Sequence, residues 1–156
     1  MKIFISYGAL HDQVTALRLQ ALGAAHGLIV YVPPAYTRQG FAPIHDADAQ
    51  AKLVEADVVL GVLGTGLTET CRQELDMGLS LKKNMIVMAS PHLAKGLGAV
   101  FGSNLVLIDP HDPGASERAI VEHLKGVHTQ QSAKNALVAL GLLTAGLVLL
   151  GSANAD

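Results

Sequence analysis

The chain has 156 residues, half of them apolar, which is enough for one buried core and one globular domain. Its formal net charge is −2, and its 11 lysines and arginines form no basic stripe, so nucleic acid is not an expected partner. The single cysteine excludes an intramolecular disulfide and cysteine-rich zinc motifs, and it suits a reducing compartment.

Apolar runs alternate with helix-length segments along most of the chain, which predicts strand–helix units and a parallel sheet. In chain order the predicted strands are 2–6, 28–32, 57–63, 84–89 and 105–108, and the predicted helices are 10–25, 44–55, 68–83 and 115–125, with a short turn after Pro91. The strands are nearly continuous in Val, Ile, Leu and Met, as expected for strands covered on both faces. We therefore expect an α/β fold with a five-stranded parallel flavodoxin-like sheet in the order 2-1-3-4-5, within a domain of residues 1–126.

The composition changes abruptly after this domain. Residues 127–133 are predicted to be a polar linker, and the following stretch "ALVALGLLTAGLVLLG" carries no charge. About 18 apolar residues at 1.5 Å per residue span roughly 27 Å, enough for a thin hydrocarbon core. We expect residues 134–153 to form a C-terminal transmembrane helix, the alternative being a core or oligomer helix. Since no leader pattern precedes the first strand, the domain is expected in the cytoplasm, held at the membrane by a single-pass anchor.

The ends of two strands predict where a ligand binds. In a sheet of this order, ligands bind beyond the carboxyl ends of the strands at the switch point, here between the first and third strands. Glycines at these ends allow close approach, and the helices that follow present free N–H groups. The predicted binding residues are Ser6, Tyr7 and Gly8 after the first strand, and Gly64 and Thr65 after the third.

Glu74 is out of place in the helix predicted after the third strand. That helix puts Cys71, Leu75, Gly78 and Leu79 on one apolar arc, and Glu74 lies inside it. An unpaired buried carboxylate is expensive, so either a cation compensates it or the arc opens onto a site. We expect the second, with Cys71 lining the pocket. The alternative is a partly buried carboxylate paired with a nearby arginine or lysine.

Three segments resemble the Toll/interleukin receptor (TIR) domain family over residues 1–126. They are the opening "IFISY", the strand "ADVVLGVLGTG" and Cys71-x-x-Glu74 in the next helix. The resemblance implies a flavodoxin-like fold and, for enzymatic members, cleavage of the nicotinamide–ribose bond of NAD by a glutamate, here Glu74. Two features depart from the family: Thr70 stands where members often carry tryptophan, and the loop "PPAYTRQGFAP" replaces the Arg-Asp-x-x-Pro-Gly form common in adaptor members.

Nucleoside deoxyribosyltransferases are a neighbouring family that the sequence also resembles. The resemblance rests on Asp57, Gly64, Glu74 and Gly78, with Glu69 as a candidate for the further acidic residue of that family. Both families break an N-glycosidic bond at a ribose-like carbon.

The resemblance implies NAD as substrate, with no cofactor. Glu74 would accept hydrogen bonds from ribose hydroxyls and offset the developing positive charge, or act as a nucleophile. In the loop after the second strand, an aromatic such as Phe41 is able to stack on a ring of the dinucleotide, and Arg38 is able to pair with a phosphate. The scattered histidines lack ligand spacing, so no metal site is expected.

The implied function is a membrane-tethered NAD glycohydrolase activated by self-assembly, with a role in signalling or defence. Tethering would raise the local concentration and favour a homo-oligomer. The alternatives are a non-catalytic TIR-like scaffold at the membrane, a nucleoside deoxyribosyltransferase-like enzyme, and a tail that itself disrupts the bilayer.

Overall fold

The sheet agrees with the expected topology. The computed structural model describes residues 1–40 and 45–130. Its five strands are parallel and form one sheet in the order β2-β1-β3-β4-β5. They are β1 (Lys2–Tyr7), β2 (Ile29–Tyr31), β3 (Val58–Leu63), β4 (Asn84–Ala89) and β5 (Leu105–Leu107). The prediction of a five-stranded parallel α/β sheet in the order 2-1-3-4-5 is therefore confirmed.

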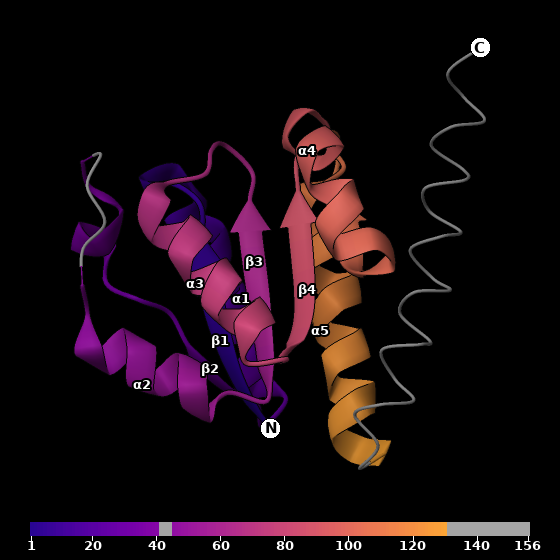
Figure 1. Cartoon of the computed structure of the whole chain (residues 1–156). Helices are drawn as coiled ribbons and strands as arrows, with labels where there is room; N and C mark the ends of the chain where they lie inside the picture. Colours follow the sequence, from indigo (N-terminus) through magenta and orange to yellow (C-terminus); the bar gives the residue numbers. More distant parts are fainter. Residues whose placement is uncertain (41–44, 131–156) are drawn as a thin grey trace.

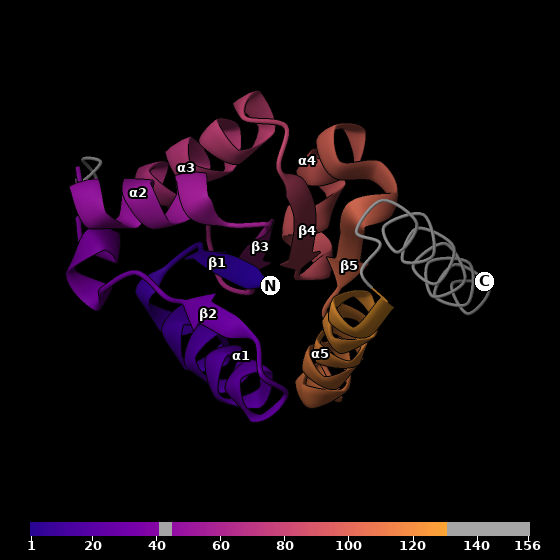
Figure 2. The same cartoon turned by 90° about the horizontal axis from the view of Figure 1, so that it is seen from below.

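Helices cover both faces of this sheet, as Figures 1 and 2 show. Helices α1 and α5 pack on one face and α2, α3 and α4 on the other. The described part of the chain has the helices α1 (Gln13–Ala25), α2 (Ala47–Glu55), α3 (Glu69–Ser80), α4 (Pro91–Phe101) and α5 (Pro113–Gln130). The described residues also include three short 3-10 turns: η1 (Leu10–Asp12) before α1, η2 (Ala35–Arg38) before α2, and η3 (Gly102–Asn104) after α4.

The alternation of side chains along β1 decides what each residue can reach. Ile3, Ile5 and Tyr7 belong to the core under α1 and α5, whereas Phe4 belongs to the core under α2 and α3. Because successive side chains on a strand point to opposite faces, Ser6 faces the same side as Phe4. Ser6 is therefore directed toward α3.

The segment after Pro91 forms the helix α4, so the prediction of a short turn there is wrong. Pro91 occupies the first turn, where a proline is tolerated because its missing N–H would be unpaired there. Gly96 and Gly98 lower the helix propensity of the segment, so the local sequence pattern did not indicate a helix there. Packing of Ala94 and Phe101 into the core stabilises the helix.

Helix α5 is longer than predicted. It continues to Gln130, so residues 127–130 of the predicted linker are helical, and Val127 is buried. The rest of that linker and the predicted apolar helix at 134–153 lie outside the described residues. Within the described ranges, no helix is both long enough and apolar enough to cross a membrane.

Candidate functional site

Helix α3 is held close to the sheet, and this fixes the position of Glu74. The side chain of Thr68 caps the helix by accepting a hydrogen bond from the Cys71 N–H. A methyl group added at Gly78 would lie 2.7 Å from the Met85 sulfur, so the helix approaches β4 as closely as a glycine permits. Glu74 lies at the edge of the packed face, and only 12% of its side chain is exposed.

Ser6 meets Glu74 from β1. Ser6 Oγ lies 2.6 Å from Glu74 Oε2 and 3.1 Å from Cys71 Sγ. A hydroxyl has one proton to donate, and a hydrogen bond to a charged carboxylate is the stronger of the two choices. Glu74 is therefore the main acceptor of the Ser6 hydroxyl, and Cys71 supports the pair from inside the core.

In the structure Arg38 pairs with Glu74. The sequence had instead predicted that Arg38 pairs with a phosphate of the ligand. Its guanidinium donates to both carboxylate oxygens, with Nη1 3.1 Å from Oε1 and Nη2 2.5 Å from Oε2. The Arg38 side chain is fully buried. The alternative interpretation of Glu74 in an apolar arc was a carboxylate paired with a nearby arginine or lysine. Arg38 is such a partner.

The surroundings of Glu74 act on its charge in opposite directions. Burial raises the pKa of the Glu74 carboxyl above its usual value. The charge of Arg38 and the hydrogen bond from Ser6 offset part of this rise, whereas the nearby Asp46 adds to it. Burial also raises the pKa of the Cys71 thiol to about 12, which favours the neutral thiol over the nucleophilic thiolate near neutral pH.

Glu74 also lines a small pocket between α2 and α3. It has a volume of about 50 Å³ and is lined by Asp46, Ala49, Gln50, Leu53, Thr70, Gln73, Glu74 and Met77. The lining combines an apolar floor with two carboxylates, two amides and a hydroxyl. Among the described residues, no lysine or arginine lines it. Pockets for drug-sized ligands have volumes of roughly 300–1,000 Å³, so this one admits only part of a dinucleotide.

Gly8, Gly64 and Thr65 belong to a second cluster, which holds two loops together. The Asp12 carboxylate accepts hydrogen bonds from the Thr65 N–H at 2.9 Å, the Thr65 hydroxyl at 3.1 Å and the Ala9 N–H at 3.2 Å. A methyl group on Gly8 would lie 1.8 Å from the Gly66 carbonyl oxygen, and one on Gly64 would lie 2.8 Å from Asp12 Oδ1. The N–H and hydroxyl of Thr65, which were expected to face a ligand, are thus engaged by Asp12, and the Gly8 N–H donates to the Val62 carbonyl oxygen.

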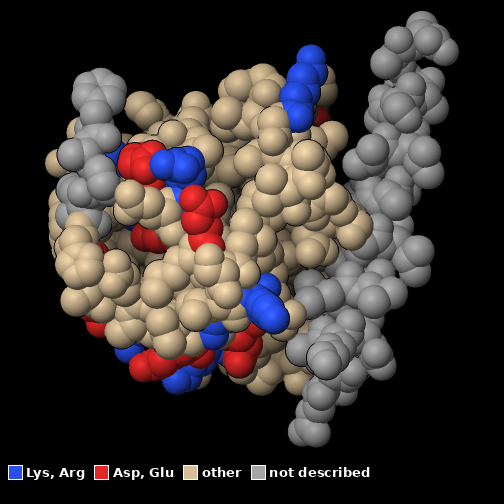
Figure 3. Space-filling model, viewed as in Figure 1, with Lys and Arg blue, Asp and Glu red and all other residues tan. Residues whose placement is uncertain are grey.

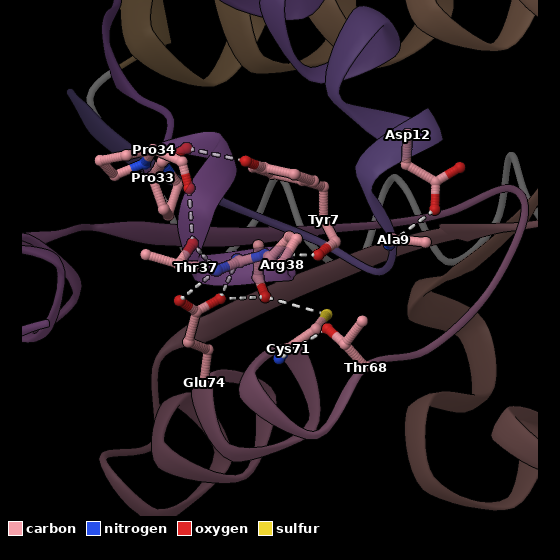
Figure 4. A network of polar contacts seen from close by, with 11 residues as sticks. Tyr7, Ala9, Asp12, Pro33, Pro34, Thr37, Arg38, Thr68, Cys71 and Glu74 are labelled. Carbon is pink, nitrogen blue, oxygen red and sulfur yellow. Dashed lines mark hydrogen bonds and ion pairs between the residues drawn. The ribbon is translucent and has the colours of Figure 1, made fainter. Parts of the chain in front are cut away.

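Figure 4 shows the network around Glu74 and Arg38 together with Asp12 and Ala9 of the second cluster. Of the predicted site residues, Ser6 and Arg38 contact Glu74 directly, whereas Cys71 contacts Ser6 and Tyr7 contacts Arg38. Phe41 lies outside the described residues. On the face drawn in Figure 3, acidic and basic side chains are intermixed, without an extended patch of one sign.

Sequence reasoning missed several residues of these clusters. Asp12 follows the first strand closely. Its place beside the predicted switch point could have identified it as a residue of the site. Asp46 caps α2 by accepting from the Asp48 and Ala49 N–H groups, a preference that aspartate shows at helix starts. Gln50 and Gln73 carry no signal beyond their helical spacing.

A scan against models of known protein families finds none that matches this chain. A search of curated proteins likewise finds no relative. The TIR resemblance therefore rests on the residues and motifs of the sequence itself, and function has to be argued from the site.

Proposed function

We propose that the chain is an NAD glycohydrolase in which Glu74 acts on the ribose of the scissile bond. The observation that carries this proposal is that Glu74 belongs both to a hydrogen-bond network and to the lining of a pocket. Ser6 and Arg38 fix the carboxylate, and the residue also lines the pocket between α2 and α3. A carboxylate oriented before substrate arrives is the element that an oxocarbenium-like transition state needs.

The charge of the pocket favours this substrate. The nicotinamide ring of NAD is cationic, and the pocket is lined by the carboxylates of Asp46 and Glu74. Since Arg38 pairs with Glu74 from outside the lining, the attraction for the cationic ring comes mainly from Asp46. When the bond to ribose breaks, nicotinamide leaves as a neutral base, so no strong acid is needed. The carboxylate then lies beside the sugar as positive charge develops on it.

The small size of the pocket supports assembly as part of the proposal. A volume of about 50 Å³ holds a fraction of NAD, so most of the dinucleotide must contact other surfaces. We propose that a second copy of the chain supplies them in a homo-oligomer. The predicted anchor at residues 134–153, with the α/β domain on the cytoplasmic side, would raise the local concentration for that assembly.

Nicotinamide release from NAD tests the proposal. The full chain is assayed at increasing concentration and on liposomes, together with Glu74→Gln and the matched surface variant Glu122→Gln. Glu122 is 62% exposed on α5, so its substitution removes the same charge without touching the pocket. We expect at least a 100-fold loss in Glu74→Gln and unchanged release in Glu122→Gln, with circular dichroism showing that both variants are folded. Equal release from all three proteins would reject the assignment of Glu74.

A non-catalytic scaffold is the second candidate, and the ion pair itself favours it. Arg38 and Glu74 neutralise each other's charge without a ligand, as a purely structural pair does. This candidate predicts no nicotinamide release from the wild-type chain at any concentration or on any membrane.

The deoxyribosyltransferase alternative is weakened by the place of Asp57. That residue precedes the amino end of β3 and accepts a hydrogen bond from the Lys2 N–H at 2.7 Å. It therefore lies at the opposite end of the sheet from the Glu74 pocket. Transfer of deoxyribose between two bases, measured with the same protein, distinguishes this activity from NAD cleavage.

A further inference from the structure

We infer that Arg38 is a positioning residue, which orients Glu74 so that one acceptor site of its carboxylate stays available to a sugar hydroxyl. This inference rests on the proposed function. It assigns a role to a residue that the sequence had linked to a phosphate.

Arg38 is itself held by a frame of buried contacts. Its Nε donates to the Tyr7 carbonyl oxygen at 2.8 Å, and Nη1 donates to Thr37 Oγ1 at 2.7 Å. The guanidinium carbon also lies 4.4 Å from the centre of the Tyr7 ring, within the range of a cation–π interaction.

The segment that carries Arg38 is anchored at a second level. The Tyr7 hydroxyl donates to the Pro33 carbonyl oxygen at 2.9 Å, and the Thr37 hydroxyl donates to the Pro34 carbonyl oxygen at 2.6 Å. Tyr7 thus contacts Arg38 of the turn η2 through its backbone carbonyl and its ring, and it contacts Pro33, before the turn, through its hydroxyl. Figure 4 shows these residues together. Such dense anchoring is what a fixed support requires, and a latch that must open would be held more loosely.

The hydrogen-bond count identifies the acceptor site that remains. Each carboxylate oxygen can accept about two hydrogen bonds. Oε2 of Glu74 accepts from Arg38 Nη2 and Ser6 Oγ, whereas Oε1 accepts from Arg38 Nη1. Among the described residues, Oε1 therefore keeps one site for a donor. This count favours recognition of one ribose hydroxyl over recognition of two.

Arg38 also opposes the groups that favour the neutral form of Glu74. The charged or titratable groups acting on this carboxyl are Arg38 from η2 and Asp46 at the start of α2, and Tyr7 of β1 and Cys71 of α3 lie in the same network. Arg38 is the cation among these described groups. Burial and Asp46 both raise the pKa of Glu74, so removing Arg38 is expected to raise it further.

Two substitutions separate the charge of Arg38 from its geometry. Arg38→Gln removes the charge, and Arg38→Lys keeps a charge but replaces the planar fork with a single ammonium. The matched control is Arg72→Gln, because Arg72 makes a similar two-pronged pair with Glu69 at 2.9 and 2.6 Å but is 56% exposed on the same helix as Glu74.

The first readout is nicotinamide release by the full chain between pH 5 and pH 9. We expect Arg38→Gln to lower kcat/KM at least 100-fold at pH 7, with the acid limb displaced to higher pH, so that the deficit shrinks as pH rises. Arg38→Lys should lose about 10-fold with its acid limb near that of wild type, and Arg72→Gln should change less than 2-fold. Activity of Arg38→Gln equal to or above wild type would show a latch and overturn the inference.

The second readout does not depend on activity. The side-chain carboxyl carbon of Glu74 is followed by 13C NMR during a pH titration, with its signal assigned by its loss in Glu74→Gln. We expect the midpoint to be higher in Arg38→Gln than in wild type; equal midpoints would overturn the inference. Failure of the proposed function is a separate result, namely wild-type protein that releases no nicotinamide. If both Arg38 variants unfold while Arg72→Gln remains folded, Arg38 is a folding residue and the inference is also overturned.

Discussion

Ser6 Oγ lies 2.6 Å from Glu74 Oε2, and this contact joins the carboxyl end of β1 to the second turn of α3. Ser6 is fully buried between apolar neighbours on a central strand. An apolar residue would continue the pattern of β1 and pack there as well. A hydroxyl at this position is useful because it satisfies a carboxylate that burial disfavours.

Replacement of Ser6 with alanine is expected to weaken both stability and the proposed activity. A hydrogen bond to a charged group contributes about 1.5–3 kcal/mol, which corresponds to roughly a 10- to 100-fold change in an equilibrium or rate. We expect a loss of stability in this range by urea denaturation and a loss of nicotinamide release of similar size. Ser80→Ala is the control, because Ser80 is exposed at the end of α3 and should change the free energy of unfolding by less than about 0.5 kcal/mol. Wild-type values for Ser6→Ala in both assays would contradict this prediction.

Cys71 is expected to resist alkylation in the native protein. It is fully buried, and its thiol, with a pKa of about 12, supplies almost no thiolate near neutral pH. Labelling with iodoacetamide at pH 7.5 should be slow in native buffer and complete in denaturant, as measured by intact mass. Cys71→Ala should keep nicotinamide release within about 3-fold of wild type. Rapid native labelling would show that the core beneath Glu74 opens.

The sequence predicted the sheet well because each of its strands has a strong local pattern. Strands buried on both faces need nearly unbroken apolar runs, and β3 and β4 have them. The 11-residue α4 was missed because Gly96 and Gly98 weaken a propensity that tertiary packing restores. Local pattern therefore predicts an element best when burial and propensity agree.

The site was predictable only in part, for a similar reason. Helical spacing placed Glu74 in an apolar arc, and the switch point between the first and third strands placed Ser6 beside the same site. Pairing of Arg38 with Glu74 depends on the conformation of the η2 turn, which no periodicity encodes. The role of Asp12 depends on two loops packing within reach of its carboxylate, a relationship between distant segments.

Gly8→Ala is expected to be among the most destabilising single-methyl changes in the chain. The added methyl group would lie 1.8 Å from the backbone oxygen of Gly66, so the loops after β1 and β3 would have to separate. Such overpacking typically costs about 1–3 kcal/mol and more where backbone must move. The matched control is Gly96→Ala in α4, where the added methyl group meets no described atom within 4 Å beyond its chain neighbours and the backbone of its own helix.

The control substitution should act in the opposite direction. Alanine at an unstrained helical glycine stabilises by about 0.4–1 kcal/mol, mainly by restricting the unfolded chain. The free energies of unfolding of the two variants, measured by urea denaturation, should therefore lie on opposite sides of wild type. Similar stability of the two variants would mean that the loops adjust without separating.

His123 is expected to make the stability of the chain depend on pH. It lies on α5, and its Nε2 atom is buried without a hydrogen-bond partner among the described residues. Burial lowers the pKa of His123 below the usual 6.5, so the unfolded state binds this proton more readily than the folded state. The free energy of unfolding must then fall as pH drops from about 6.5 through the pKa of the folded state. The measurement is urea denaturation at pH 5.0, 6.0 and 7.5 for wild type, His123→Leu and the exposed control His111→Leu.

The test is the difference in the free energy of unfolding between wild type and His123→Leu, because other titrating groups are common to both proteins. We expect the free energy of unfolding of His123→Leu to exceed that of wild type most at pH 5.0 and least at pH 7.5. The free energy of unfolding of His111→Leu should follow that of wild type at all three pH values. A constant difference between wild type and His123→Leu across this range would mean that His123 binds its proton equally well in both states. Since leucine also removes an unpaired buried nitrogen, a gain that remains at pH 7.5 measures the burial of that polar atom.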